Sequence, residues 1–223
     1  MKRSEVNALI EEAKELLSVN NIRLPPFAYW LPKEWETKGA EANEIRACKL
    51  GWDLSDFGEG KFSELGLTLF TVRNGHNSEA PYNRKTYCEK FLIVGENQIT
   101  PMHYHKLKTE DIIVRAGGHL VVVCHHRSEG DGLGDAPIRV SCDGVARDLK
   151  AGEEMVLTQG ESVTLPPYLY HAFWAEAGTG TSIVGEVSKV NDDENDNFFF
   201  DPIGRFPDIE EDAPPVHLLC TEY

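Results

Sequence analysis

The chain has 223 residues, of which 41% are hydrophobic, so it is long enough for one sizeable core and short for two independent ones. Its 37 acidic and 22 basic side chains give a net charge of −15, which disfavours nucleic acid and anionic membranes as partners. No apolar run approaches the roughly 20 residues that cross a bilayer, and the charged N-terminus is unlike a signal peptide. Five widely spaced cysteines without a CxxC pair indicate free thiols in a reducing compartment, so we expect a cytoplasmic protein.

Helices are expected mainly in the first quarter of the chain. Residues 4–19 carry apolar side chains at the spacing of one helix face. The prolines of "LPPFAYWLP" (24–32) should end that helix. Residues 41–50 are compatible with a second, short helix, and residues 51–66 are predicted to be loop with turns.

From about Leu67 the sequence changes to short β-rich runs, most of them punctuated by Gly, Asn, Asp or Pro. Many short strands without helical segments between them predict an antiparallel barrel or sandwich. The segment 126–137 is predicted to be an exposed hairpin excursion, and Phe198–Phe200 indicate that part of the acidic tail packs on the body. We therefore expect a mostly β protein of one domain (1–223), with an N-terminal helical arm (1–66), a β-barrel (67–190) and a C-terminal tail (191–223).

Two histidines and a glutamate stand close together in "MHYHKLKTEDIIV". Because side chains alternate faces along a strand, His103 and His105 point to the same side. Glu110 follows His105 at an odd spacing, so it joins the histidines only if the chain turns within 106–109. His171 begins a predicted strand after a Pro-Pro bend, which suits a position on the inner wall of a barrel.

Three histidines and one carboxylate form a mixed nitrogen and oxygen ligand set. A lone buried histidine is usually a satisfied core residue, but two on one face repel if both are charged, and one cation satisfies both. Softness favours a first-row divalent ion (Mn²⁺, Fe²⁺, Co²⁺, Ni²⁺ or Zn²⁺) over Ca²⁺ or Cu⁺. Four protein ligands leave two positions of a six-coordinate ion free for a bidentate oxygen ligand.

The spacing of these residues resembles the first motif of the cupin superfamily, which runs Gly, five residues, His-x-His, three or four residues, Glu, six residues, Gly. His103, His105, Glu110 and Gly117 occupy those positions. The leading glycine departs from the motif, since Gly95 lies eight residues before the first histidine.

The second cupin motif is matched by Gly160, Pro166 and His171, while Tyr168 and Ala175 replace its inner glycine and its asparagine. Both motifs in this order on a β-rich background imply a cupin, that is, a jelly-roll type β-barrel. The long separation between the motifs is consistent with an insertion at 126–137.

Over most of its length the chain is similar to bacterial D-lyxose isomerases of the cupin type. The similarity is carried by the helical N-terminus and by "PPFAYWLP", "CEKFLIVGENQITPMHYHKLKTEDII", "PPYLYHAFWAE" and "GEVSKVNDDENDNFF". It implies an often homodimeric enzyme, typically with Mn²⁺, that interconverts D-lyxose with D-xylulose and often D-mannose with D-fructose. The family's four metal ligands map onto His103, His105, Glu110 and His171.

Aldose–ketose isomerisation moves hydrogen between C1 and C2 of a sugar. One route forms an enediol and needs a base, an acid and positive charge near the two oxygens. A metal that chelates O1 and O2 supplies that charge as a Lewis acid. A metal-assisted hydride shift is the alternative, and both routes stay open.

Candidates for proton transfer should lie beside the metal ligands. Lys108, in the predicted turn, is either solvated or part of the site, where a nearby cation would lower its pKa. Lys90 lies in an apolar strand, where a lysine is costly unless it is paired. If 178–180 is a hairpin turn, Glu186 comes close to His171, as a partner of that ligand or as the general base.

The acidic tail and the aromatics of the second motif are weaker candidates. Arg205 is a candidate for hydroxyl binding, whereas Asp192 and Asp193 are predicted to be solvated. Tyr168, Phe173 and Trp174 are compatible with a sugar pocket, although aromatics near a barrel mouth more often belong to the core.

Two other functions are compatible with the ligand set. A metal-dependent cupin dioxygenase or decarboxylase can use the same four residues, and an anaerobic assay separates an oxygen-consuming enzyme from an isomerase. A non-catalytic sugar-binding cupin is the third possibility, and in that case substitution of Lys108 or Glu186 has no rate to lower.

Overall fold

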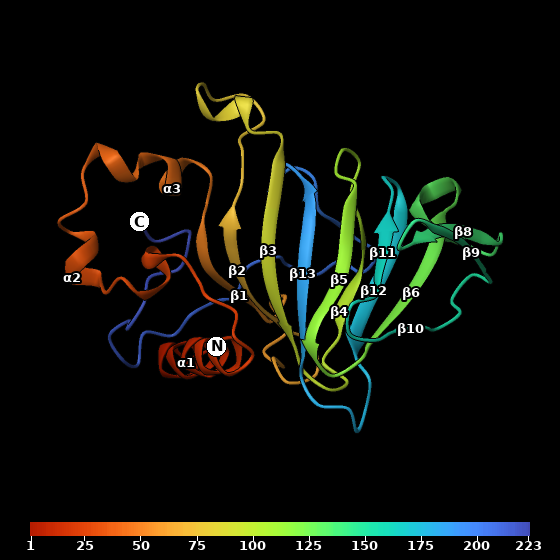
Figure 1. The fold of residues 1–223 in the computed structure, drawn as a ribbon, viewed down its shortest axis with the longest axis horizontal. Coiled ribbons are helices and arrows are strands. Elements are labelled where there is room, and N and C mark those ends of the chain that lie inside the picture. Colours follow the sequence, from red (N-terminus) through yellow and green to blue (C-terminus); the bar gives the residue numbers. More distant parts are fainter.

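Two curved antiparallel sheets form the body of the protein in the computed structural model, which describes residues 1–223 (Figure 1). The larger sheet has the strand order β1-β2-β3-β13-β5-β11-β8-β9, and the smaller one has the order β10-β6-β12-β4-β14 with β7 beside β6. This confirms the predicted mostly β fold. The strands are β1 (Gly51–Ser55), β2 (Leu67–Arg73), β3 (Tyr87–Val94), β4 (Thr100–Tyr104), β5 (Glu110–Gly117), β6 (Leu120–Arg127), β7 (Leu133–Gly134), β8 (Ile138–Cys142), β9 (Val145–Leu149), β10 (Met155–Leu157), β11 (Ser162–Leu165), β12 (Leu169–Ala175), β13 (Ser182–Lys189) and β14 (Phe198–Phe199).

The N-terminal arm covers the outer face of the larger sheet. Helix α1 (Arg3–Val19) is followed by two short helices, α2 (Pro32–Trp35) and α3 (Asn43–Ala47). The apolar face of α1 packs in one cluster with Trp52 and Phe70 of β1 and β2, and Figure 1 places the helix beside these strands. Short 3₁₀ turns lie at Pro26–Tyr29, Ala40–Ala42, Tyr82–Arg84 and Glu129–Asp131.

Strand β1 departs from the sequence-based expectation that residues 51–66 form a loop. Its five residues are all buried, and it pairs with β2 so that Trp52 lies opposite Phe70. Asp53 and Ser55 have low intrinsic β propensity, which hid the strand. The edge strand forms because the helical arm covers its outer face and β2 supplies its hydrogen bonds, while most of residues 56–66 form turns.

The interior of the barrel is divided into an apolar part and a polar end. A cluster of 21 buried apolar residues fills most of the space between the sheets. On β3, β5 and β13 the inward side chains change from apolar to charged at one end, where Lys90, Glu110 and Glu186 replace aliphatic residues. Strand register holds these charges together, because Glu186 lies opposite Lys90 on the neighbouring strand.

The C-terminal tail returns to the smaller sheet at this polar end. Residues Phe198–Phe199 form β14, which pairs with β4 so that Phe199 lies opposite His103. The predicted excursion at 126–137 is a β6–β7 hairpin with a 3₁₀ turn.

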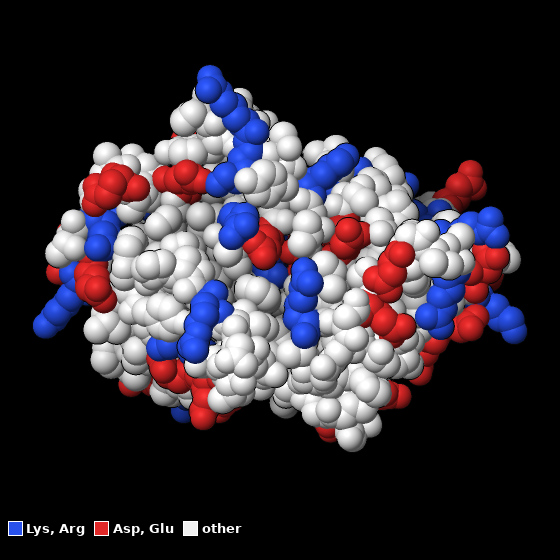
Figure 2. Space-filling model, in the orientation of Figure 1, with Lys and Arg blue, Asp and Glu red and all other residues white.

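None of the helices has the length and apolar character needed to span a bilayer. Figure 2 shows lysine and arginine side chains interspersed with acidic ones on the face it presents, without a broad basic area.

Candidate active site

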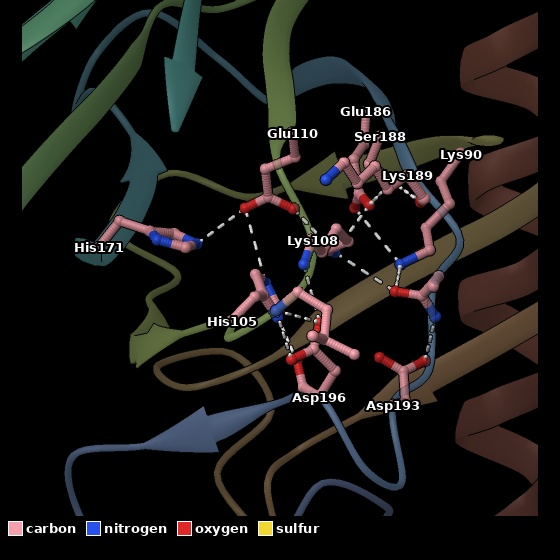
Figure 3. Close-up of polar contacts among 12 residues, drawn as sticks. Lys90, His105, Lys108, Glu110, His171, Glu186, Ser188, Lys189, Asp193 and Asp196 are labelled. Carbon is pink, nitrogen blue, oxygen red and sulfur yellow. Dashed lines mark hydrogen bonds and ion pairs between the residues drawn. The ribbon is translucent and has the colours of Figure 1, made fainter. Parts of the chain in front are cut away.

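Four side chains converge in the polar end of the barrel. His103 lies in β4, His105 directly follows it, Glu110 begins β5, and His171 lies in β12. One nitrogen or oxygen atom from each of them lies within 4.8 Å of the others, and all four residues are buried. His103 and His171 are partners across the β4–β12 pair. The turn between β4 and β5 brings Glu110 back toward the histidines (Figure 3).

The backbone determines which nitrogen of each histidine faces the centre of this group. Nδ1 of each ring lies against a backbone carbonyl oxygen, at 2.7 Å for His103, at 3.0 Å for His171, and against Asp196 for His105. A carbonyl oxygen only accepts hydrogen bonds, so Nδ1 carries the hydrogen and Nε2 keeps a free lone pair. Nε2 of His105 and Nε2 of His171 are buried without a hydrogen-bond partner.

These lone pairs crowd around one carboxylate oxygen. Oε1 of Glu110 lies 2.9 Å from Nε2 of His171 and 3.6 Å from Nε2 of His105. Acceptor atoms this close repel one another in a buried site unless a positive charge lies between them. Imidazole and carboxylate together suit a first-row divalent ion, and fixing Nδ1 on a carbonyl orients each ring for ligation. The four residues therefore form a possible metal site.

The charge states agree with that chemistry. Burial lowers the pKa of His105 to about 4 and holds that of His103 well below its ordinary value, so both imidazoles are neutral at pH 7. Burial raises the pKa of Glu110, but the Lys108 ammonium outweighs this, and the pKa lies well below its ordinary value. Neutral nitrogens and an ionised carboxylate are the ligand forms that bind a cation.

A lysine–carboxylate network adjoins the four residues (Figure 3). The Lys108 ammonium lies 2.7 Å from Oε2 of Glu110 and 2.9 Å from Oε1 of Glu186, and donates to Asn191 Oδ1 at 3.3 Å. The Lys90 ammonium donates to the same Asn191 oxygen at 2.7 Å and to Oε2 of Glu186 at 3.3 Å. Both lysines and both carboxylates are buried, so neither lysine is a solvated turn or surface residue.

The network keeps its members charged. Burial lowers the pKa of Lys108, but the carboxylates of Glu110 and Glu186 raise it by more, so the pKa is raised overall. The protein groups therefore shift the pKa of Lys108 in the direction opposite to the lowering that we expected from a nearby cation. Burial raises the pKa of Glu186, yet Lys108 and Lys90 outweigh this and the pKa is lowered. The site therefore holds ammonium–carboxylate pairs at neutral pH.

Glu186 reaches the site by a route that sequence reasoning did not foresee. We expected it to pair near His171 across a hairpin, but β12 and β13 belong to different sheets. β13 lies between β3 and β5, where Glu186 is opposite Lys90 and Ile112. The expected pairing was wrong, and Glu186 lies close to the histidines because the two sheets face each other.

Arg205 lies beside the network, between two carboxylates. Its Nη2 lies 2.6 Å from Oδ2 of Asp53 and 3.1 Å from Oδ2 of Asp193. Burial raises the pKa of Asp193, but Arg205 and the two lysines outweigh this, and the pKa lies well below its ordinary value. The expectation that Asp193 is solvated was therefore wrong in part, because its carboxylate is only 22% exposed and is paired with Arg205.

Asp196 is a buried residue that sequence reasoning missed. Its carboxylate accepts hydrogen bonds from the backbone N–H groups of Lys106, Leu107 and Lys108 at 2.7–3.2 Å. Its backbone carbonyl contacts Nδ1 of His105. The residue thus holds the turn that joins β4 to β5 and orients one imidazole. An aspartate within an acidic tail carries no sequence signal for this role, apart from the adjacent phenylalanines.

A cavity connects these groups. Its wall includes His103, His105, Glu110, Glu186 and Arg205. The apolar part of the wall is formed by Phe57, Leu67, Leu69, Leu92, Ile112, Phe173 and Phe199. Tyr168 is 47% exposed and lies outside this wall. Such a mixture of apolar surface with a few convergent polar groups is typical of a small-molecule site.

Sequence and structure comparisons relate the chain to known proteins. A family model for D-lyxose isomerase matches residues 1–223. A D-lyxose/D-mannose isomerase of Serratia proteamaculans is 46% identical over 224 residues, covering 100% of this chain and 98% of the relative. The Escherichia coli O157:H7 protein of the same name is 45% identical with the same coverage. In fold, the chain is similar to the L-ribose isomerase of Cellulomonas parahominis, solved with L-ribose (TM-score 0.62, 18% identity, 94% and 98% of the two chains covered).

The substitution His171→Ala should remove metal. It takes away one of three imidazole ligands, whereas His119→Ala changes a partly exposed histidine that pairs with Glu176 outside the site. After reconstitution with Mn²⁺ and dialysis, metal analysis should find about one ion per chain in the wild type and the control, and far less in His171→Ala. Equal stoichiometry in all three proteins would remove His171 from the ligand set.

His105 should make the stability of the metal-free protein depend on pH. Its pKa is about 4 in the folded state and about 6.5 in the unfolded chain. Its contribution is complete above pH 6.5 and is lost as the pH falls toward 4, because the unfolded state binds a proton that the folded state does not. The free energy of unfolding should fall by up to about 1.4 kcal/mol per pH unit from this group.

Denaturant unfolding of the metal-free wild type and of His105→Gln between pH 7 and 4.5 measures this effect. The free energy of unfolding should change less steeply with pH in His105→Gln than in the wild type, by up to about 1.4 kcal/mol per pH unit. Identical slopes would show that His105 is not held neutral in the folded protein.

Asp196→Ala should weaken metal binding, although the Asp196 side chain contacts no metal ligand. The change leaves three backbone N–H groups of the 106–108 turn without their acceptor, so His105 and Glu110 lose their fixed separation. We expect the Mn²⁺ affinity to fall about 10–100-fold, as for other residues that orient ligands. Titration calorimetry with Mn²⁺ measures it, with the exposed Glu194→Gln as control, and an affinity that matches the control would contradict this role.

Proposed function

The chain belongs to the D-lyxose isomerase family, and on this premise we propose that it interconverts D-lyxose with D-xylulose and D-mannose with D-fructose. The observation that carries the proposal is the ionised Glu186 carboxylate, held between two lysines in the cavity whose wall also contains three of the four residues of the possible metal site. This pairing supplies a base and an acid side by side, as a sugar isomerase needs.

The proposal includes a divalent ion held by His103, His105, Glu110 and His171. Mn²⁺ is our first choice, with Co²⁺, Ni²⁺, Zn²⁺ and Fe²⁺ as alternatives that suit the same ligands. When bound, such an ion supplies a Lewis acid for the carbonyl and hydroxyl oxygens of a sugar. The proposal further includes a single cupin domain and a homodimer, as the family resemblance implies, and a cytoplasmic location, as the free cysteines indicate.

In the proposed reaction, Glu186 and Lys108 exchange protons with the sugar. Glu186 removes the proton from C2 of the aldose while Lys108 donates a proton to the oxygen on C1, which gives an enediol. Glu186 then returns its proton to C1, and the proton of the C2 hydroxyl passes to Lys108. Both side chains end as they began, and the aldose has become a ketose.

The remaining charged groups prepare these two residues. Lys90 and Lys108 keep Glu186 ionised, which is the protonation state that a base needs. Glu110 and Glu186 keep Lys108 protonated, which is the protonation state that an acid needs. Asn191 holds both ammonium groups in place by accepting from each. Two lysines around a carboxylate favour proton transfer over oxygen activation, which argues against the dioxygenase alternative.

The test is incubation of metal-reconstituted protein with D-lyxose, D-mannose, D-xylulose and D-fructose, followed by chromatography with and without oxygen. The wild type should form the partner sugar with Mn²⁺, Co²⁺ or Ni²⁺ at a rate independent of oxygen. Glu186→Gln should retain metal but lose about 10²–10⁴-fold in kcat. The control Glu176→Gln changes a partly exposed glutamate away from the cavity and should match the wild type.

Absence of any product with all three metals would reject the isomerase proposal. Deuterium from D₂O in the product distinguishes the enediol route, which exchanges the carbon-bound proton, from a hydride shift, which does not. Full activity of Glu186→Gln would leave the isomerase but remove this residue as its base.

A further inference from the structure

Three residues of the cavity wall each have a polar side-chain atom that is buried without a hydrogen-bond partner. The atoms are Oγ1 of Thr100, Oδ1 of Asn197 and Nη1 of Arg205. A buried polar atom without a partner costs free energy, so such atoms are rare unless something else satisfies them. All three residues lie on the wall that also contains His103 and Glu110.

Thr100 reaches the cavity through an irregularity in β4. His103 lies opposite His171 and Thr100 lies opposite Phe173, so three steps along β4 match two steps along β12. This extra residue is a β-bulge, and it turns the Thr100 side chain onto the face that His103 occupies. Without the bulge the odd separation would place the two side chains on opposite faces. Bulges that redirect a side chain in this way are frequent beside active sites.

The other two atoms are held in position by the C-terminal tail. Asn197 follows Asp196, whose carboxylate is fixed by the backbone of the β4–β5 turn. Arg205 has one guanidinium nitrogen fixed by Asp53 and Asp193, which leaves Nη1 free. Donor and acceptor are therefore oriented before any ligand arrives, which lowers the cost of binding.

The neighbouring charged groups are paired mainly with one another. The Lys108 ammonium lies within 3.3 Å of acceptors on Glu110, Glu186 and Asn191. Thr100, Asn197 and Arg205 thus add one hydroxyl group, one amide oxygen and one N–H donor that no protein group engages. The same wall also contains aromatic and leucine side chains. Hydroxyl groups along a carbon chain match this combination.

We propose that Thr100, Asn197 and Arg205 form the subsite that binds the hydroxyl groups of the sugar remote from its reacting carbons. The inference rests on the proposed isomerase function and specifies how its substrate is recognised. Two residues along β12, from His171 to Phe173, span about 6.6 Å. Since Thr100 lies opposite Phe173, a similar distance separates Thr100 from the histidines. It is comparable to the length of a pentose, so a sugar with C1 and C2 near the histidines reaches Thr100 with its remote hydroxyl groups.

The test uses Thr100→Val and Asn197→Leu, which remove hydrogen-bonding capacity while keeping similar size. Ser182→Ala is the matched control, since Ser182 Oγ is also buried without a partner but lies outside the cavity wall. Each cavity variant should lower kcat/KM for D-lyxose by about 3–10-fold with unchanged Mn²⁺ content, and the control should stay within about twofold. Arg205→Lys serves as a further variant, with a larger expected loss of about 10–100-fold for a charged donor.

Monodeoxy sugars separate recognition from a general structural effect. For each cavity variant, at least one of 3-, 4- and 5-deoxy-D-lyxose should show no further loss, because the hydroxyl that the side chain binds is already missing. An equal loss with every deoxy sugar, or wild-type kcat/KM in both Thr100→Val and Asn197→Leu, would overturn the subsite.

Calorimetry with D-arabinitol, which is D-lyxose reduced at C1, gives a readout that does not depend on turnover. The metal-loaded wild type should bind it, with an affinity about 3–10-fold weaker in Thr100→Val and Asn197→Leu and unchanged in Ser182→Ala. If the wild type has no isomerase activity but shows this pattern, the proposed function fails and the subsite stands. If the wild type isomerises D-lyxose and the variants bind D-arabinitol equally well, the subsite fails and the function stands.

Discussion

The convergence of three imidazole lone pairs on one buried carboxylate is the constraint on which the rest of the site depends. Backbone carbonyls fix the hydrogen of each ring on Nδ1, so the ε nitrogens face inward. With Glu110 ionised among them, the four side chains suit a divalent cation. The Lys108 ammonium lies 2.7 Å from the second oxygen of the same carboxylate. The possible metal site and the lysine–carboxylate network thus share Glu110.

The barrel makes this arrangement possible by separating its interior into two parts. Aliphatic side chains fill most of the space between the sheets and provide the apolar burial that stabilises the fold. At one end of β3, β5 and β13 the inward positions carry charges instead, and strand register places Lys90 opposite Glu186. Buried charges are tolerated there because each has an oppositely charged or hydrogen-bonding partner.

The C-terminal tail completes the site that the barrel begins. Asn191 accepts from both lysines, Asp193 pairs with Arg205, and Asp196 holds the turn between two candidate ligands. Asn197 and Arg205 then place unpaired hydrogen-bonding atoms on the cavity wall. An acidic, proline-containing segment at the end of the chain is thereby part of the site, and its charges are compensated by basic residues of the barrel and by Arg205 within the tail itself.

The sequence by itself determined the mostly β fold, the amphipathic N-terminal helix and the four residues of the possible metal site, because these follow from local periodicity and from motif spacing. It did not reveal β1, whose Asp53 and Ser55 are poor strand formers and are held by pairing with β2. Only the tertiary structure decided that Glu186 faces the histidines from the opposite sheet, that Asp196 is buried and that a bulge turns Thr100 inward. These features depend on strand order, register and charge compensation between residues far apart in the chain, and no local pattern of residues encodes such long-range contacts.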